Sequence, residues 1–412
     1  MNTADTLDSI LSHPPSASLF AKAVERLDEL PIRERREALE RAAFGMESWP
    51  DHTRRAPAAA WRRIQQGSAP PPWWGLVRTV HVREGDTLEV GPALAPLTVV
   101  DASRVNVDPS PLREARGLRS LDLSANDAVD SLDFLTETPR VERLALSGLE
   151  LFPELSPVRE LPALHTLDLS FNPNLDDLAP IASLEALRWL DLSGCERLED
   201  FAPLATLAGL ETLALDGCVG LRNLAFLDQL HRLRRLSARR LPLLVDLLPL
   251  AASKLEHLYL GGPRLVTGAP LGNLASLVEL ALSDAPRLVD LSFLPQLEKL
   301  LVLQVDGVPA RLPALTGPTL EELLIADCPE VRDLEPLAGL DALERLTLRD
   351  LPLEDLAPLA GLRKLERLSL TRCPRIRDLS PLRRLPLRQL ELVGADPGLD
   401  MSELPAGCKV VG

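Results

Sequence analysis

Most of the chain repeats one short pattern of apolar and polar positions, L-x-x-L-x-L. Alternate residues of a β-strand point to opposite faces, so the pattern predicts a short strand with its leucines inside and its x positions outside. The copies begin at Leu118, Val141, Leu164, Leu187, Leu210, Leu233, Leu255, Leu277, Leu300, Leu320, Leu343, Leu365 and Leu387, with two weaker copies at Val77 and Leu97. One turn alone cannot bury its leucines, so the series predicts about fifteen stacked turns that share one core.

The half of each turn that follows the strand has a pattern of its own, as in LEDFAPLATL (198–207) and LEDLAPLAGL (353–362). Proline is favoured in the first turn of a helix, where its missing N–H loses no bond, and a preceding Asp can accept backbone N–H groups. We therefore expect a short helical or 3-10 turn on the convex side. One carboxylate per turn is a poor calcium cage, so we interpret the recurring Asp as architecture. It stands at Asp177, Asp200, Asp246, Asp290, Asp333, Asp355 and Asp378.

Taken together, these strings resemble the leucine-rich repeat over about residues 77–400. The 22–23-residue length and the PLAxL segment are similar to the internalin and phosphatase-regulator subclass of bacterial type. The resemblance implies an α/β solenoid, a horseshoe with a parallel concave β-sheet and short convex helical or 3-10 turns. It also implies that one position per turn forms a buried ladder whose side chains bond the loop backbone. That position holds Asn126, Asn172, Cys195, Cys218, Cys328 and Cys373.

The pattern divides the chain into three segments. Residues 1–75 lack the repeat and predict helices over 18–30, 32–44 and 57–66. They are expected to form an α-helical cap on the open end of the solenoid, or a small adaptor with its own partner. Residues 76–400 form the solenoid, and residues 401–412 are expected to close its last turn.

The outward positions carry the functional hypothesis. Their first column alternates in sign, which predicts pairs across strands worth about 0.2–1 kcal/mol each. It runs Arg119, Glu142, His165, Arg188, Glu211, Arg234 and Glu256. The middle column holds Asp101, Asp122, Asp168 and Asp191. This acidic run has two interpretations, a common form of the repeat or a surface for an electropositive ligand.

A partner site is predicted on the copies from Leu233 to Leu320. Arg235 and Arg240 have no acidic neighbour in their columns, and the next copies turn the only Tyr and several apolar side chains outward. Tyr and Arg are frequent hot-spot residues, and grouped exposed apolar side chains often mark interfaces. The predicted site comprises Arg235, Arg240, His257, Tyr259, Val278, Leu301, Val302 and Leu324, with Phe171 and Trp189 as a second anchor. A competing register at 297–300 would turn Leu301 and Val302 to other positions. The number of residues from Asp290 to the strand, which equals that from Asp333 to Leu343, favours a start at Leu300.

Composition narrows the function. The net charge of −15 argues against general nucleic-acid binding but leaves room for a local basic patch. No secretory signal, no 18-residue apolar run and no CxxC spacing is present, which predicts a cytoplasmic protein. No nucleotide-binding, zinc-protease or serine-hydrolase motif occurs, so we expect no catalysis, cofactor, metal or small-molecule substrate. The expected function is a protein–protein interaction scaffold, as adaptor or regulator; the alternative is a sensor or effector whose N-terminal helices recruit an enzyme or receptor.

Overall fold

The computed structural model describes residues 55–70, 74–75, 77–315, 319–394 and 398–411. The helices predicted over 18–30 and 32–44 lie outside these residues. The chain divides into two compact units, Met1–Asp168 and Leu169–Gly412, which we describe separately.

The described part of the first unit begins with helix α4 (Arg55–Gln65), where the sequence predicts a helix over 57–66. It packs against the chain before the second strand: Trp61 Nε1 donates to Asp86 Oδ2 at 2.9 Å, and the rings of Trp61 and Trp74 stack with centroids 6.0 Å apart. Five strands follow, each parallel to the next. They are β1 (Thr79–His81), β2 (Val99–Asp101), β3 (Ser120–Asp122), β4 (Arg143–Ala145) and β5 (Thr166–Asp168), with 3-10 turns at Gly91–Ala93, Ser110–Glu114, Asp133–Glu137 and Ser156–Glu160.

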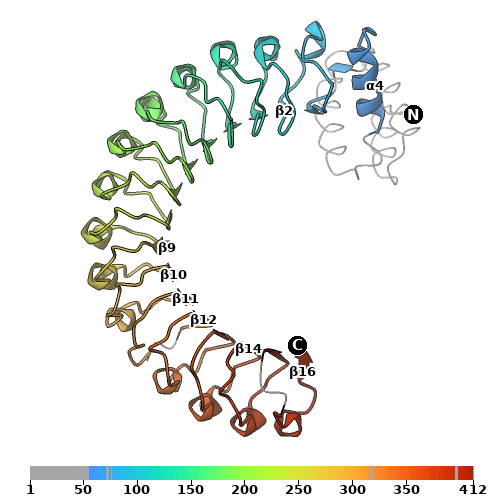
Figure 1. Cartoon of the computed structure of the whole chain (residues 1–412). Helices are drawn as coiled ribbons and strands as arrows, with labels where there is room; N and C mark the ends of the chain where they lie inside the picture. The colour runs from blue at the N-terminus through green and yellow to red at the C-terminus, as the bar shows by residue number, and fades with distance from the viewer. Residues whose placement is uncertain (1–54, 71–73, 76, 316–318, 395–397, 412) are drawn as a thin grey trace, which may run out of the picture. The chain divides into compact units, whose positions relative to one another are not determined.

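The second unit repeats the same strand and turn, again with parallel neighbours in sequence order. Its strands are β6 (Trp189–Asp191), β7 (Thr212–Ala214), β8 (Arg235–Ala238), β9 (His257–Gly261), β10 (Glu279–Ser283), β11 (Val302–Asp306), β12 (Glu322–Ala326), β13 (Arg345–Arg349), β14 (Arg367–Thr371), β15 (Gln389–Val393) and β16 (Lys409–Val411). Its 3-10 turns are Ala179–Ser183, Ala202–Thr206, Ala225–Gln229, Leu248–Ala252, Ala269–Asn273, Leu294–Gln296, Glu335–Leu337, Ala357–Gly361, Ser380–Arg384 and Met401–Glu403. Figure 1 shows that, in each unit, the strands lie on one side of the stacked repeats and the 3-10 turns lie on the other side.

Leucine rows fill the space between the strands and the 3-10 turns. Leu258 and Leu260 on β9 are fully buried, as are Leu190 and Leu192 at β6. Burying one such side chain stabilises the fold by about 1.5–3 kcal/mol, so the rows are the main source of stability. The outward side of the sheet, opposite the leucines, is called the strand face below.

The recurring Asp residues stabilise the start of the 3-10 turns, as the sequence predicts. Each accepts the backbone N–H two residues later, at 2.7–3.3 Å. A carboxylate there satisfies a donor that the short turn leaves without a partner. The ladder position is also as expected, because Asn126 is buried and bonds both the N–H and the C=O of Val107.

Two details differ from or refine the sequence-based expectation. A sixteenth strand, β16, lies in the segment expected only to close the last turn, and it pairs with β15. At the irregular turn, β11 pairs Val302 with Glu279 on one side and with Glu322 on the other. This register confirms the start at Leu300, which is itself buried.

Candidate functional site

The first outward column of the strand face consists largely of ion pairs. Arg119 pairs with Glu142, and the N–O distances of the Arg188–Glu211 and Arg234–Glu256 pairs are 3.8 and 3.6 Å. These side chains are well exposed, so each pair contributes little stability. The charged side chains of this column pair with one another, so the column offers no unpaired charge to a ligand.

The acidic middle column is also satisfied locally. Asp122 and Asp191 accept the N–H of Ser124 and Ser193 at 2.9 and 2.8 Å. Asp101 accepts both the N–H and the hydroxyl of Ser103. A carboxylate that accepts the N–H two residues on forms a local turn, which favours the architectural interpretation over an electropositive ligand.

The predicted site contains one dense polar network, centred on Asp216 between β7 and β8. Asp216 is only 7% exposed and accepts two bonds from the Arg239 guanidinium, at 2.7 and 2.9 Å. Its other oxygen accepts the Ser237 hydroxyl at 2.6 Å and the Arg239 N–H at 2.8 Å. Such bidentate, charge-assisted bonds hold both side chains in one arrangement.

The network continues onto β9 and β10. The Arg239 guanidinium lies 5.7 Å from the centre of the Tyr259 ring, a cation–π distance. Burial and a hydrogen bond with Glu279 raise the pKa of Tyr259. His257 Nδ1 lies 2.9 Å from Glu279 Oε2. The sequence identified Tyr259 and His257 as outward residues but missed Glu279, whose carboxylate joins them.

Arg235 lies beside His257 in the sheet, Arg240 directly follows Arg239 in the chain, and both are exposed. Neither makes an ion pair with any residue that the structure describes. Arg235 has Thr212 and His257 as its strand neighbours, which is why no carboxylate reaches it. The two guanidinium groups are therefore available to a ligand, and that of Arg235 lies near the fixed Tyr259.

The apolar residues of the predicted site are half-buried, and they are not all direct neighbours in the sheet. Leu301 follows Val278 across the strands, with its N–H donated to the Val278 carbonyl at 2.8 Å, and Val302 is next along the chain. Leu324 instead lies opposite Gln304 in another row, in which Ala281 also separates it from Tyr259. Leu324 is therefore a diagonal neighbour of Val302 and not directly opposite it. Whether the apolar residues act as one group stays a prediction.

Phe171 and Trp189, the predicted second anchor, also occupy different rows. Trp189 is half-buried on β6, in the row that continues through Thr212 to Arg235. Phe171 is 61% exposed and has a left-handed φ of 55°. Arg240 has φ 54°, with Gly194 and Gly217 at the same position in the turns between. The same repeat position also has a positive φ at Ala125, Asp284, Asp327, Asp350 and Arg372. The left-handed backbone at Phe171 and Arg240 is therefore a feature of the repeat and does not mark them as a site.

The ladder residues lie inside the turns, away from any surface. Cys195 and Cys218 donate to the carbonyls of Leu169 and Leu192, both at 3.1 Å, and Cys328 and Cys373 make similar bonds. The Asn172 amide donates to Leu169 O at 2.8 Å. Burial raises the pKa of Cys218, Cys328 and Cys373, which keeps these thiols protonated at neutral pH.

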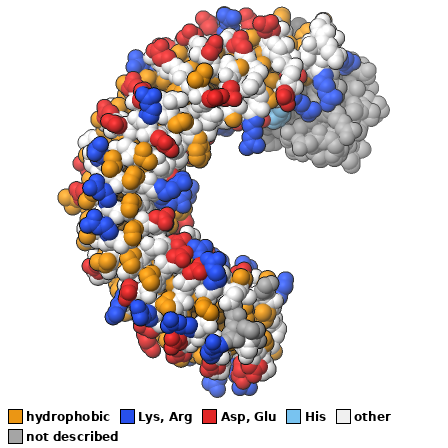
Figure 2. All heavy atoms as spheres, in the orientation of Figure 1, with side chains coloured by type: hydrophobic (Ala, Val, Ile, Leu, Met, Phe, Trp, Pro, Cys, Tyr) orange, Lys and Arg blue, Asp and Glu red, His pale blue; other side chains and the backbone are white. Residues whose placement is uncertain are grey.

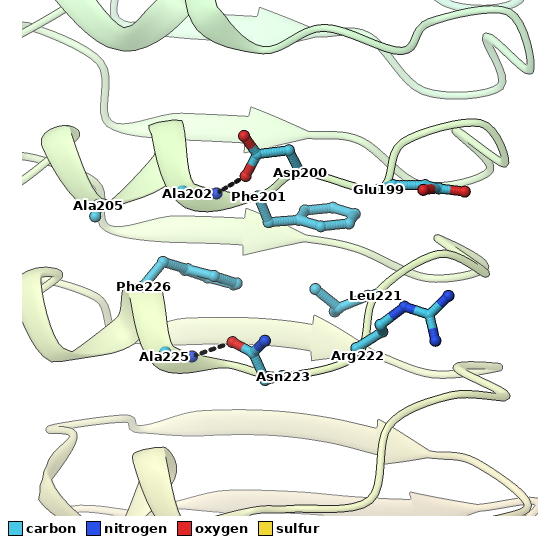
Figure 3. Close-up of a pocket in the computed structure, with 10 residues that line it drawn as sticks. All are labelled: Glu199, Asp200, Phe201, Ala202, Ala205, Leu221, Arg222, Asn223, Ala225 and Phe226. Atoms are coloured by element: carbon cyan, nitrogen blue, oxygen red, sulfur yellow. Dashed lines mark hydrogen bonds between the residues drawn. The ribbon is translucent and has the colours of Figure 1, made fainter.

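A hollow of about 340 Å³ lies on the flank of the solenoid, between two successive turns of the second unit. Figure 3 shows Phe201 and Phe226 facing each other across it, with ring centroids 6.5 Å apart, and the side chains of Glu199 and Arg222 beside it. Asp200 and Asn223 are occupied in accepting the N–H groups of Ala202 and Ala225. The hollow offers an apolar floor but no nucleophile and base in contact.

Two features are absent from the described residues. These residues hold no group of three or more His, Cys, Asp or Glu side chains placed to bind a metal ion. No helix among them is both long and apolar enough to cross a membrane.

Comparison with known proteins identifies the fold. No protein-family model matches the chain, and no curated protein matches its sequence. An internalin from Listeria monocytogenes is 22% identical, with a TM-score of 0.64 over 76% of this chain and 94% of that one. A leucine-rich-repeat protein of Leptospira interrogans is 20% identical, with a TM-score of 0.65 over 86% and 98%.

A third solved structure, a complex of TLR13 with ssRNA13, is 20% identical to this chain, with a TM-score of 0.55 over 77% of this chain and 52% of that one. At these identities the likeness concerns the fold. Together with the stacked parallel strands, the 3-10 turns and the buried Asn and Cys ladder, it shows that the chain is a leucine-rich-repeat solenoid.

Proposed function

We propose that the chain is a non-catalytic protein-binding module that binds one partner protein on the strand face of β8–β12, as a cytoplasmic adaptor or regulator. The observation that carries the proposal is a pair of exposed cations, Arg235 beside His257 in the network that fixes Tyr259, and Arg240, which follows Arg239 in the chain. A partner carboxylate would find two guanidinium groups that the described chain leaves without an ion pair. Arg and Tyr are also the residue types that dominate binding energy at interfaces.

The preformed network favours binding over catalysis. Asp216, Arg239 and Tyr259 already make the contacts that hold them, so a partner would order few side chains on arrival. Val278, Leu301 and Val302 supply a small apolar surface next to this network. The recruiting role considered for the N-terminal helices falls mainly on residues outside the described ranges and stays a prediction.

Affinity purification from the native cell extract tests the proposal. The baits are the full chain, the strand-face variant R235A/R240A/Y259A/L301A, and a control variant E335A/R363A/K364A with three exposed residues changed away from the strand face. All three must first show the same thermal melt. We expect one protein to be retained by the wild type and the control after nuclease treatment, and to be lost from the strand-face variant. Equal retention by all three baits would contradict a strand-face site.

Nucleic acid is the competing ligand class, because one similar structure is a complex with an RNA. The net charge of −15 opposes it here, since RNA binding requires a positive field. If the retained material disappears on nuclease treatment of the wild-type bait, the partner is an RNA or is held through one, and the proposal fails.

A further inference from the structure

One surface position changes character in the middle of the second unit. It is the residue directly before the Asp whose carboxylate accepts the backbone N–H at the start of each 3-10 turn. In some turns another residue replaces that Asp. In six turns this surface position is charged: Asp176, Glu199, Arg222, Arg332, Glu354 and Arg377. In three successive turns it is valine, and Val245, Val266 and Val289 are 48%, 45% and 64% exposed. We call these three residues the valine column.

A second exposed apolar residue lies in the first of these turns. Leu248, at the start of the 3-10 turn after Val245, is 65% exposed. The equivalent residues of three neighbouring turns are Ala202, Ala225 and Ala269. Side chains exposed to this degree contribute little to the core, so the fold does not explain the substitution of large apolar groups.

In two turns toward the ends of the second unit, which we call the end turns, an acid–arginine pair occupies this flank. Arg197 lies 3.6 Å from Asp176 of the preceding turn, and Arg375 lies 3.2 Å from Glu354 of the preceding turn. In each pair, the arginine stands three residues before the Asp of its own turn, and a buried Leu or Ile follows it directly. Each pair thus joins an acid on one turn to an arginine on the next turn.

The middle turns keep the arginines and lack the acids. Arg264 and Arg287 occupy the arginine position, one turn after Val245 and Val266. Both are exposed, and neither makes an ion pair with any residue in the described ranges. Two cations are thus left beside an apolar column, at the place where the end turns carry Asp176 and Glu354. Figure 2 shows a line of hydrophobic side chains across successive turns, with Lys and Arg side chains beside it.

We propose that the valine column, Leu248, Arg264 and Arg287 form a second docking surface, which binds an acidic amphipathic helix of a partner protein. Apolar side chains of the helix would cover the valines, and its carboxylates would take the places of the missing acids. Strand spacing of about 4.8 Å is close to the helical pitch of about 5.4 Å, so one apolar residue per helical turn can meet one valine per repeat. This surface lies on the flank, so it is separate from the strand face of the proposed function.

The other occupants fit less well. Valine offers no flat face for a base to stack on, which disfavours a nucleic acid despite the arginines. A second copy of the chain would need about 800 Å² on each partner for a stable interface, far more than four side chains provide. A helix pressed against the column needs only a small contact area and supplies the missing charges.

Fluorescence anisotropy of labelled peptides with the full chain tests the proposal. Three helical peptides of about eighteen residues share one leucine stripe and carry Glu, Gln or Lys beside it, and a single-stranded RNA is the fourth probe. We expect the Glu peptide to bind, the Gln peptide to bind about tenfold more weakly, and the Lys peptide and RNA not to bind.

Variants assign the binding to the flank. V245E/V266E restores the acid–arginine pairs of the end turns, so it should fold normally and weaken the Glu peptide at least tenfold. R264E/R287E should transfer the preference to the Lys peptide, which a merely structural defect would not do. E354Q, the matched control in an end turn, should bind as the wild type does.

Four results would overturn the proposal: equal binding of the three peptides, undiminished binding to V245E/V266E, binding of the RNA in their place, or no binding of any peptide at millimolar concentration. The strand-face variant R235A/R240A/Y259A/L301A should bind the Glu peptide normally. Failure of the strand-face site and failure of the flank site are therefore separate outcomes.

Discussion

Two regions of the second unit share one interior and differ on one flank. In the end turns, Asp176 and Glu354 pair with an arginine of the next turn. In the middle turns, Val245 and Val266 stand in their place, and Arg264 and Arg287 make no ion pair with the described residues. The leucine rows behind both regions are equally buried. The comparison shows that the interior sets the fold while the flank is free to change, so a local departure from the pattern carries functional information.

The largest expected effect tests whether the interiors are equivalent. Leu190→Ala in an end turn and Leu258→Ala in a middle turn should each lower the free energy of unfolding by about 2–5 kcal/mol, because both remove fully buried methyl groups. Val266→Ala should stay within about 0.5 kcal/mol of the wild type. Urea unfolding measures all three. If Val266→Ala costs as much as Leu258→Ala, the valine column belongs to the core and the comparison breaks down.

The second prediction uses the ladder, which holds Cys218 before the middle turns and the apolar Leu241 and Ala285 within them. Burial raises the pKa of Cys218 above that of an unfolded thiol. The folded state then binds the proton more tightly, so the stability it contributes is complete below about pH 8.5 and is lost as the pH rises from there. Each pH unit removes up to about 1.4 kcal/mol.

Thermal melts between pH 7.5 and pH 10 check this effect, with Cys218→Ala as the control because its methyl group has no proton to lose. We expect the wild-type melting temperature to fall more steeply with pH than that of the control. Parallel slopes would show that the thiol ionises as readily in the folded chain as in the unfolded one.

The smallest expected effect sharpens the comparison directly. Val266→Glu places a carboxylate one turn before Arg287, as Glu354 stands before Arg375. An exposed pair of this kind should stabilise the chain by about 0.2–1 kcal/mol, and the gain should shrink at high salt. A double-mutant cycle with Arg287→Ala isolates the pair, since the glutamate should gain nothing without its arginine. A coupling energy of zero at low salt would show that the two side chains do not meet.

Much of the fold could be predicted because each turn contacts chiefly its neighbours. The repeat period located the strands, and the Asp that precedes each 3-10 turn indicated where that turn begins. The spacing from Asp290 even settled the register at Leu300, which β11 confirms. The sixteenth strand was less visible, because Lys409–Val411 carries no leucine and its side chains stay exposed.

The candidate sites were harder to predict. Alternation placed Tyr259 and Arg235 outward, but it could not show that Glu279 and Arg239 hold Tyr259 while Arg235 has no ion pair among the described residues. Leu324 was grouped with Val302 because both face outward, although the pleat puts them in different rows. The valine column is visible in the sequence once the turns are aligned on their Asp, yet its meaning depends on exposure and on the ion pairs of the end turns.

The sequence by itself determined the period, the strand positions and which side of each strand faces the core, because these depend on short-range spacing and on the burial of leucine. Only the tertiary structure decided which charges are satisfied, which residues adopt a left-handed backbone and which apolar side chains stay in water. These properties depend on which side chains of neighbouring turns come within contact distance in space. The number of residues between two positions along the chain does not give that distance.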